Sequence, residues 1–337
     1  MNASLDPFLL EKLESPARWF VTGGAGFIGS HLVETLLGTG QEVVCLDDFS
    51  TGTRENLEAA VVAAGETSRA NLEVIEGDIT DPEACRRAVE GTDYVLHQAA
   101  LASVPASLRD PQRIHDVNVG GTLQVFEAAR AAGISRIVYA SSSAVYGDDQ
   151  HEVKREDHVG TPLSPYAATK TIMETWAKTY SRCYGIEFVG LRYFNVYGSR
   201  QDPSGPYAAV IPIWEKALKE GSEIRIFGDG KTTRDFIHVS DVVRSNLAAA
   251  LVPLPSETQA LAINVGTGIE TSLLDLFETM RSVITSTDDP QSVAEPVFES
   301  FRKGDIRKSV ADVGMLENQL SVSPGKDLEA GIRELLA

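Results

Sequence analysis

Cysteines and basic residues are scarce in this sequence. The 337 residues include only three cysteines, Cys45, Cys85 and Cys183, and no Cys-x-x-Cys pair, which argues against a disulfide framework or a zinc site. Thirty basic residues stand against 48 acidic ones, and the formal net charge of −18 argues against nucleic acid or an anionic membrane as a partner. An anionic ligand must therefore meet arginines that are placed locally.

Long apolar runs are also missing. No stretch of about eighteen apolar residues occurs, so the sequence predicts no membrane-spanning helix. The first residues, MNASLDPFLLEKLESPARW, carry no basic region ahead of an apolar run, unlike a secretory signal. Together with reduced thiols, this pattern predicts a cytoplasmic protein.

Histidines are few, and no two of them have metal-ligand spacing with a carboxylate nearby, so we expect no metal. His97 lies in the apolar run YVLHQAA. A hydrogen-bonded structural imidazole is the favoured interpretation there.

Strands and helices alternate over the first two hundred residues. The apolar run RWFVTGG precedes the amphipathic stretch SHLVETLLGTG, and the pattern continues to SRIVYASSS through a long helix near residues 110 to 132. Such alternation is typical of a parallel sheet covered on both faces. We therefore expect an α/β fold with a doubly wound Rossmann sheet in residues 1–195, a return to it near 236–267, and a smaller mixed substrate-binding lobe in 196–337.

Four glycines occur within VTGGAGFIGS, residues 21–30, between the first strand and its helix. Gly23, Gly26 and Gly29 form a G-x-x-G-x-x-G pattern, in which missing side chains let the backbone approach a pyrophosphate at the helix N-terminus. On the glycines alone, a tight turn with close helix packing remains an alternative. Asp47, at the end of the second strand, favours NAD over NADP because a carboxylate accepts a ribose hydroxyl and repels a 2′-phosphate.

Hydroxyl and amine groups follow in the second half of the sheet. SPYAATK places Tyr166 and Lys170 four residues apart at the start of a predicted helix, so both project from one face. ASSSAVYG brings serine hydroxyls to the carboxyl edge of the sheet, where ligands of this architecture bind. An ammonium beside a phenol, together with a cationic nicotinamide, favours a phenolate that can take a proton from a sugar hydroxyl.

These stretches resemble the extended short-chain dehydrogenase/reductase family, and within it the nucleotide-sugar 4-epimerases. The shared motifs run in order over nearly the full chain: TGGAGFIGS, LDDFSTG, GDI, HQAA, SSSAVYG, YAATK, LRYFNVYG, TRDFIHV and RKGD. The resemblance implies a UDP-sugar substrate, NAD as the cofactor and a homodimer formed by the helices near Arg109 to Ala132 and from Tyr166.

The same resemblance assigns site residues. Tyr166 is the expected base, Lys170 binds the ribose and tunes the phenol, and Ser142 bridges the phenol and the sugar 4-oxygen. The expected cofactor contacts are Gly23, Gly26, Phe27, Ile28, Asp47, Ser50, Thr51, Gly52, Asp78, Ile79, Gln98 and Ala100, besides Tyr166 and Lys170. The expected substrate contacts are Ala102, Ser142, Ser143, Tyr166, Asn195, Ala209, Val210, Phe227, Arg234, Arg302, Asp305 and Ser309.

The residues after Ser142 indicate which reaction of the family is catalysed. Related dehydratases carry an Asp-Glu pair there, whereas this chain has Ser143-Ala144, which cannot eliminate water. The reaction that remains is epimerisation, in which hydride moves from C4 of the sugar to NAD and then back to the opposite face of C4. A net oxidoreductase that releases its reduced cofactor, and a nucleotide-sensing protein without turnover, are the alternatives from other classes.

The sugar is indicated by Ser309, four residues after Asp305. In the family this position borders the C2 substituent, and a small residue there accompanies N-acetylated sugars. The resemblance therefore predicts UDP-N-acetylglucosamine and UDP-N-acetylgalactosamine as the preferred substrates. The alternative substrates are UDP-glucose, UDP-galactose and a UDP-uronic acid. The uronic acid is included because Arg200 or Arg307 could bind its carboxylate.

Overall fold

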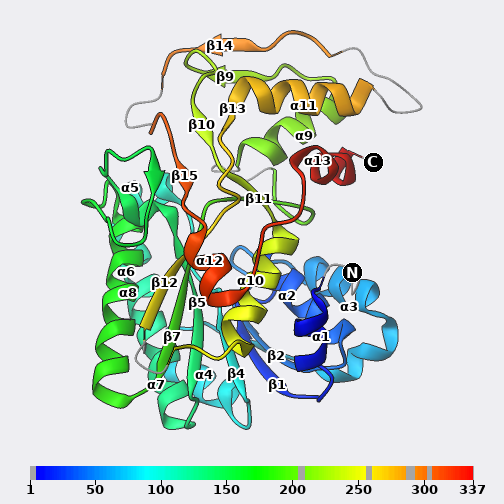
Figure 1. The fold of residues 1–337 in the computed structure, drawn as a ribbon. Helices are drawn as coiled ribbons and strands as arrows, with labels where there is room; N and C mark the ends of the chain where they lie inside the picture. The colour runs from blue at the N-terminus through cyan, green and yellow to red at the C-terminus, as the bar shows by residue number, and fades with distance from the viewer. Residues whose placement is uncertain (1–4, 204–208, 256–259, 286–292, 302–305, 337) are drawn as a thin grey trace.

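A seven-stranded parallel sheet forms the centre of the protein (Figure 1). The computed structural model describes residues 5–203, 209–255, 260–285, 293–301 and 306–336. The strand order is β12-β7-β5-β4-β1-β2-β3, and the predicted doubly wound sheet is thereby confirmed. The strands are β1 (Arg18–Thr22), β2 (Glu42–Asp47), β3 (Leu72–Glu76), β4 (Tyr94–His97), β5 (Arg136–Ser142), β7 (Glu187–Tyr193) and β12 (Ala260–Val265).

Both faces of the sheet are covered because its strands are apolar on both sides. Val21 and Val43 point into one core, whereas Phe20 and Val44 point into the other, as the two-residue period of a strand requires. One core packs against α1 (Pro7–Lys12), α2 (Phe27–Gly38), α3 (Arg54–Ala64), α10 (Val239–Leu251) and α12 (Gly314–Leu320). The other packs against α4 (Pro82–Val89), α7 (Thr122–Ala131) and α8 (Pro165–Tyr184).

The long helix predicted near residues 110 to 132 is present, with one irregular turn. α6 (Pro111–His115) passes into a π-helical segment, Asp116–Gly121, and then into α7. α5 (Val104–Arg109) lies just ahead of it. Such π segments often mark functional sites, and this one faces the cavity described below.

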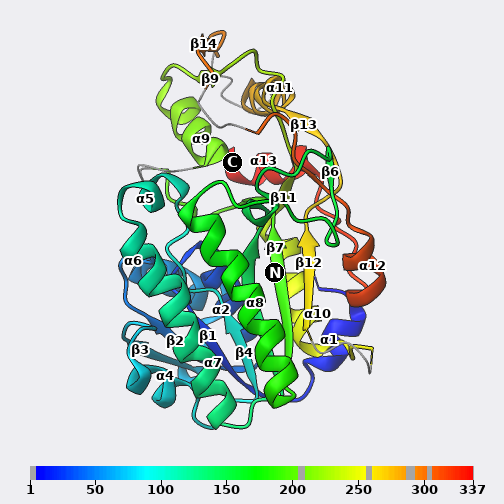
Figure 2. The same ribbon diagram turned by 90° about the vertical axis from the view of Figure 1, so that its left-hand side faces the viewer.

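A smaller lobe stands beyond the carboxyl ends of the strands, at the top of Figures 1 and 2. Its own core contains Trp214, Ile226, Phe277 and Ile332. The lobe's elements are α9 (Val210–Glu220), β9 (Arg225–Phe227), β10 (Thr233–Arg234), β13 (Thr271–Ser272), α11 (Leu273–Thr285), β14 (Val297–Glu299) and α13 (Leu328–Leu336).

Two short parallel pairs connect lobe and sheet. β8 (Asn195–Tyr197) pairs with β11 (Phe236–His238), and β6 (Val153–Lys154) pairs with β15 (Val310–Ala311). Both pairs join segments far apart in sequence, so the loops after β5 and β7 are fixed against the lobe. Within the described ranges, no helix combines the length and apolarity needed to cross a membrane.

Candidate active site

The glycine loop connects β1 to α2 through a turn that leaves no room for side chains. Gly23 has φ +67°, and a Cβ on it would lie 2.8 Å from the Cα of Ala99. A Cβ on Gly29 would lie 2.0 Å from the carbonyl oxygen of Gly23. These two glycines are therefore needed for the turn and for close packing of the helix on the strand.

Gly26 has a different role in the same loop. It is the N-cap of α2, so no side chain caps the helix, and the first-turn residues Phe27 and Ile28 line a cavity. The uncapped N-terminus of a helix is a favourable place for phosphate oxygens. The tight-turn explanation is thus confirmed for Gly23 and Gly29, and the phosphate contact stays a prediction for Gly26.

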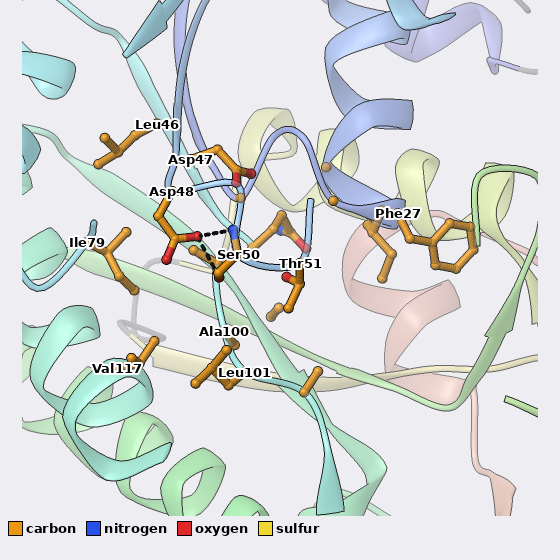
Figure 3. A pocket seen from close by; sticks show the side chains of 18 of the residues that line it. Phe27, Leu46, Asp47, Asp48, Ser50, Thr51, Ile79, Ala100, Leu101 and Val117 are labelled. Atoms are coloured by element: carbon orange, nitrogen blue, oxygen red, sulfur yellow. Dashed lines mark hydrogen bonds between the residues drawn. The ribbon is translucent and has the colours of Figure 1, made fainter. Parts of the chain in front are cut away.

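Asp47, at the end of β2, binds the glycine loop directly. One carboxylate oxygen accepts the backbone N–H of Ala25 at 2.9 Å, and the other accepts that of Phe49 at 2.8 Å. Burial raises the pKa of Asp47, and the two N–H donors oppose that rise. Asp48, its exposed neighbour, accepts the N–H and hydroxyl of Ser50, as Figure 3 shows.

The floor of the cavity rests on buried His97. Its Nδ1 lies 2.7 Å from Thr22 Oγ1 and its Nε2 lies 2.9 Å from Thr122 Oγ1. The Thr122 hydroxyl donates to Asn118, so it accepts from Nε2–H, and the imidazole is neutral. Burial, and then the charge of Lys170, lower the pKa of His97 to about 3. The predicted structural role of this histidine is confirmed.

Tyr166 and Lys170 lie on the first turns of α8, which Ser164 caps. Burial raises the pKa of the Tyr166 phenol, and a hydrogen bond with the Ser142 side chain lowers it. The protein alone therefore does not produce a phenol of low pKa. The predicted lowering of this pKa, which includes the charge of a bound nicotinamide, stays a prediction.

Lys170 is a buried amine, only 2% exposed. Its Nζ donates to the carbonyl oxygen of Ala140 at 2.7 Å and lies 5.9 Å from the centre of the Tyr166 ring. Burial lowers the pKa of Lys170 to about 7, and the carboxylate of Glu174 opposes that change. A shift of this kind in a cavity is typical of functional lysines.

The first cavity extends from the glycine loop to Tyr166 and has a volume of about 320 Å³ (Figure 3). It contains every expected cofactor contact except Gly52, together with Ala102 of the expected sugar wall. Gly52 lies behind the glycine loop, since a Cβ there would lie 2.7 Å from the carbonyl carbon of Ala25.

A second cavity, of about 580 Å³, lies between residues 194–197, which follow β7, and the lobe elements α9, β9 and β10. It contains five of the expected substrate contacts: Asn195, Ala209, Val210, Phe227 and Arg234. Tyr193 lines the first cavity and the next residue, Phe194, lines the second, so this segment borders both cavities.

Five expected substrate contacts line neither cavity or lie outside the described residues. Ser142 and Ser143 are partly buried at the end of β5 and contribute to the lining of neither cavity. Ser309 is also partly buried, directly before β15, and lines neither. Arg302 and Asp305 lie outside the described residues.

Sequence reasoning missed several residues of the first cavity. Tyr193 donates a hydrogen bond to Gln98 at 2.9 Å, and Asn246 accepts one from the Gln98 amide at 2.9 Å, so both orient an expected cofactor contact. Asn118, in the π segment, fixes the backbone of Leu101 through two hydrogen bonds. Other lining residues that the sequence did not predict are Leu46, Asp48, Gly77, Ala99, Leu101, Arg113, Val117, Ala140 and Ser141.

Comparison with known proteins identifies the class. The model of the NAD dependent epimerase/dehydratase family matches residues 19–266, and the chain belongs to this family. UDP-glucose 4-epimerase of Mycolicibacterium smegmatis is 38% identical over 94% of this chain and 96% of the relative.

Two solved structures are similar over the whole fold. UDP-N-acetylglucosamine 4-epimerase from Methanobrevibacter ruminantium, in complex with UDP-N-acetylmuramic acid, has a TM-score of 0.85 at 36% identity and covers 96% of this chain and 97% of its own. UDP-glucose 4-epimerase of Thermus thermophilus in complex with NAD has a TM-score of 0.80 at 34% identity, with 95% and 97% covered.

NAD is the cofactor, and the first cavity fits it. A side chain at Gly23 would collide with the backbone, the α2 N-terminus is free of a capping side chain, and Asp47 and Asp48 lie at the same end. The buried amine of Lys170 and the phenol of Tyr166 lie at the other end. The cavity therefore offers donors for the pyrophosphate and acceptors for ribose hydroxyls.

Asp47 provides a test of cofactor choice. We expect NAD to bind far more tightly than NADP. Asp47→Ala should reduce this difference in affinity, because the carboxylate that repels a 2′-phosphate is lost. Asp47→Asn, which keeps one acceptor oxygen for the loop, is the companion variant. Calorimetry on cofactor-free protein measures both affinities, and equal binding of NAD and NADP by the unmutated chain contradicts the assignment.

Lys170 provides a test of the buried amine. Its folded pKa, about 7, lies below the ordinary value of 10.5, so the folded state loses stability when the amine is protonated. Lys170→Met should therefore stabilise the cofactor-free protein below pH 7, and this gain should shrink as the pH rises from about 7 toward 10. Urea denaturation across this range measures it, with exposed Lys178→Met as the control on the same helix. A gain that does not change with pH contradicts the prediction.

Proposed function

We propose that this protein interconverts the C4 epimers of UDP-sugars with NAD as its cofactor, and that UDP-N-acetylhexosamines are its preferred substrates. The main support is that the segment of Tyr193 and Phe194 borders both cavities, and that Tyr166 and Lys170 line the first of them. A nucleotide sugar held in the second cavity can place its hexose against the phenol in the first.

Each residue of the chain has a chemical task in this proposal. When bound, NAD accepts hydride from C4 of the sugar and returns it to the opposite face of that carbon. The Tyr166 oxygen takes the proton of the 4-hydroxyl and later gives it back, and the Ser142 hydroxyl, in contact with the phenol, bridges it to the sugar oxygen. Arg234 and Asn195, in the second cavity, hold the diphosphate and the sugar.

The residues that follow Ser142 support epimerisation over elimination. Ser143 and Ala144 begin the 3₁₀ helix Ser143–Tyr146, directly after β5. Neither side chain can act as a carboxylic acid or a carboxylate base at this place. The two residues directly after Ser142 therefore offer no acid or base for the elimination of water, which favours reduction of the 4-keto sugar.

The sugar preference has two supports. Ser309 is small, and the similar structure from Methanobrevibacter ruminantium is a UDP-N-acetylglucosamine 4-epimerase. A uronic acid is disfavoured, because Arg200 is paired with Glu34 and Arg307 with Asp229, so both guanidinium groups already meet a carboxylate.

Ser309→Tyr tests the preference. We expect kcat/KM for UDP-N-acetylglucosamine to fall by about tenfold or more and that for UDP-glucose to change little, because a bulky ring would fill the space of the acetamido group. Ser309→Ala, which keeps a small side chain, should retain the preference for acetylated sugars. Chromatographic separation of the C4 epimers measures both rates. Preference for plain hexoses in the unmutated chain, or acetylated-sugar turnover unaffected by the tyrosine, refutes the proposal.

Two further points belong to the proposal. An epimerase leaves its cofactor in the starting state, so absorbance at the wavelength of NADH should not rise in proportion to product; a stoichiometric rise favours a net oxidoreductase. We also propose that the protein is a homodimer, in which the α6–α7 helix and α8 pair with their counterparts across a two-fold axis. Sedimentation at several protein concentrations tests this proposal.

A further inference from the structure

A buried acid lies on the same face of α8 as Tyr166 and Lys170. Glu174 follows Lys170 by four residues, as Lys170 follows Tyr166, so the three side chains lie one above another along the helix. Their exposed fractions are 8% for Tyr166, 2% for Lys170 and 5% for Glu174. The charges of this row therefore act on one another with little solvent screening.

The Glu174 carboxylate is held in one position by neighbouring strands. Its Oε1 accepts the hydroxyl of Ser141 at 2.7 Å and the Nε of Arg192 at 2.9 Å, and its Oε2 accepts Nη2 of Arg192 at 2.8 Å. Arg192 is 2% exposed, so this is a buried, bidentate ion pair between α8 and β7, which run side by side in Figure 2.

Ser141 places that carboxylate at the catalytic edge of β5. The residue before it, Ala140, accepts the hydrogen bond of the Lys170 amine, and the residue after it, Ser142, contacts the Tyr166 phenol. The hydrogen bond from Ser141 to Glu174 thus lies between the two contacts that fix the amine and the phenol. A shift of Glu174 would move α8 against this edge.

We propose that Glu174 is a positioning residue for the reaction, whose fixed negative charge keeps the Lys170 amine protonated beside the Tyr166 phenol. This inference rests on the proposed roles of Tyr166 and Lys170. In this inference, the ion pair between Glu174 and Arg192 affects the pH dependence of catalysis as well as the packing of α8 on β7.

The other groups around Lys170 do not supply this negative charge. On its own helix lies the Tyr166 phenol, and from β4 comes His97, which is neutral. From β5 comes Tyr139, whose pKa burial raises well above its ordinary value, and from β7 comes the positive Arg192. Loss of the Glu174 charge therefore leaves the buried Lys170 and Arg192 without this anion, so the Lys170 proton is lost more easily.

Glu174→Gln tests the proposal in the holoenzyme. The acid limb of kcat, set by the phenol, and the alkaline limb, set by the amine, should both move to lower pH by up to roughly one unit, because loss of a nearby negative charge makes both groups release their protons more easily. KM should change little. Glu220→Gln, the same change at an exposed glutamate at the end of α9, is the control and should keep both limbs.

A spectroscopic measurement gives a readout other than turnover. The chain has nine tyrosines, so the titration of Tyr166 is taken as the difference in tyrosinate absorbance between the protein and its Tyr166→Phe variant. The same difference in the Glu174→Gln background should titrate at lower pH, because the phenolate no longer faces a second negative charge. Identical differences in both backgrounds overturn the proposal.

The outcomes separate the inference from the proposed function. If Tyr166→Phe retains turnover, the catalytic assignment itself fails; if Tyr166→Phe is inactive and Glu174→Gln keeps both pH limbs, only the role of Glu174 fails. Should Glu174→Gln not fold, Glu174→Asp decides, because it keeps the charge but withdraws it by one methylene. We expect it to lower kcat at least several-fold with both limbs retained, and an unchanged kcat overturns the proposal.

Discussion

Replacement of Tyr166 by phenylalanine should lower kcat by roughly 10²- to 10⁴-fold while the fold and NAD binding persist, because a positioned base typically contributes that much. The phenol is the group in the first cavity that Ser142 contacts and that the Lys170 amine approaches. Removing one oxygen leaves the buried ring in place, so packing changes little. Turnover with UDP-N-acetylglucosamine and with UDP-glucose is the measurement.

The control for this variant lies on the same helix. Tyr184→Phe makes the identical change at a tyrosine that is 54% exposed at the far end of α8, and it should leave kcat unaltered. Circular dichroism and bound NAD content verify that both variants are folded. Near-normal turnover by Tyr166→Phe would show that another group is the base.

Replacement of Gly29 by alanine should reduce activity by about 100-fold and the free energy of unfolding by about 3 kcal/mol. The added Cβ would lie 2.0 Å from the Gly23 carbonyl oxygen and 2.8 Å from the Cα of Gly24. Both obstacles are backbone atoms, so α2 must move away from β1. That movement shifts the Gly26 N-cap and the phosphate-facing first turn together.

Gly120→Ala is the matched control for the glycine loop. A Cβ on Gly120, in the π segment of the long helix, meets nothing within 4 Å. Alanine there should leave stability unchanged or raise it, since it reduces the freedom of the unfolded chain. Denaturant unfolding with and without NAD measures both variants. A Gly29→Ala protein as stable and as active as the Gly120→Ala protein contradicts the packing argument.

The sequence predicted those parts of the fold that depend on local patterns. Buried parallel strands are continuous apolar runs, and RWFVT and EVVCLD became β1 and β2 for that reason. The glycine loop between β1 and α2 was predicted for a similar reason, because the absence of a side chain affects the backbone only within a few residues. The short β6–β15 and β8–β11 pairs were not predicted, because each joins two segments of only two or three residues that lack a period.

The buried ion pair was also missed, although its signal was present. Arg192 stands in FVGLRYF, in the middle of an apolar strand, and a charge buried there requires an anion close by. Glu174, on the helix that carries Tyr166, was one acid that could have been proposed as the partner of Arg192. Sequence spacing alone does not say which acid meets which base, since that depends on the packing of α8 against β7.

The position of β12 at the edge of the sheet limits how this protein can recombine with its relatives. The chain leaves the sheet after Tyr193, builds the wall of the second cavity, and then returns, so that Ala260 to Val265 pair with Phe188 to Tyr193 of β7. A single crossover after residue 193 would therefore exchange an edge strand together with the substrate lobe, and the new strand would have to match a foreign β7. Transfer of sugar specificity between relatives with the nucleotide sheet left intact needs several crossovers, which exchange the lobe segments and keep α10 and β12 with their own sheet.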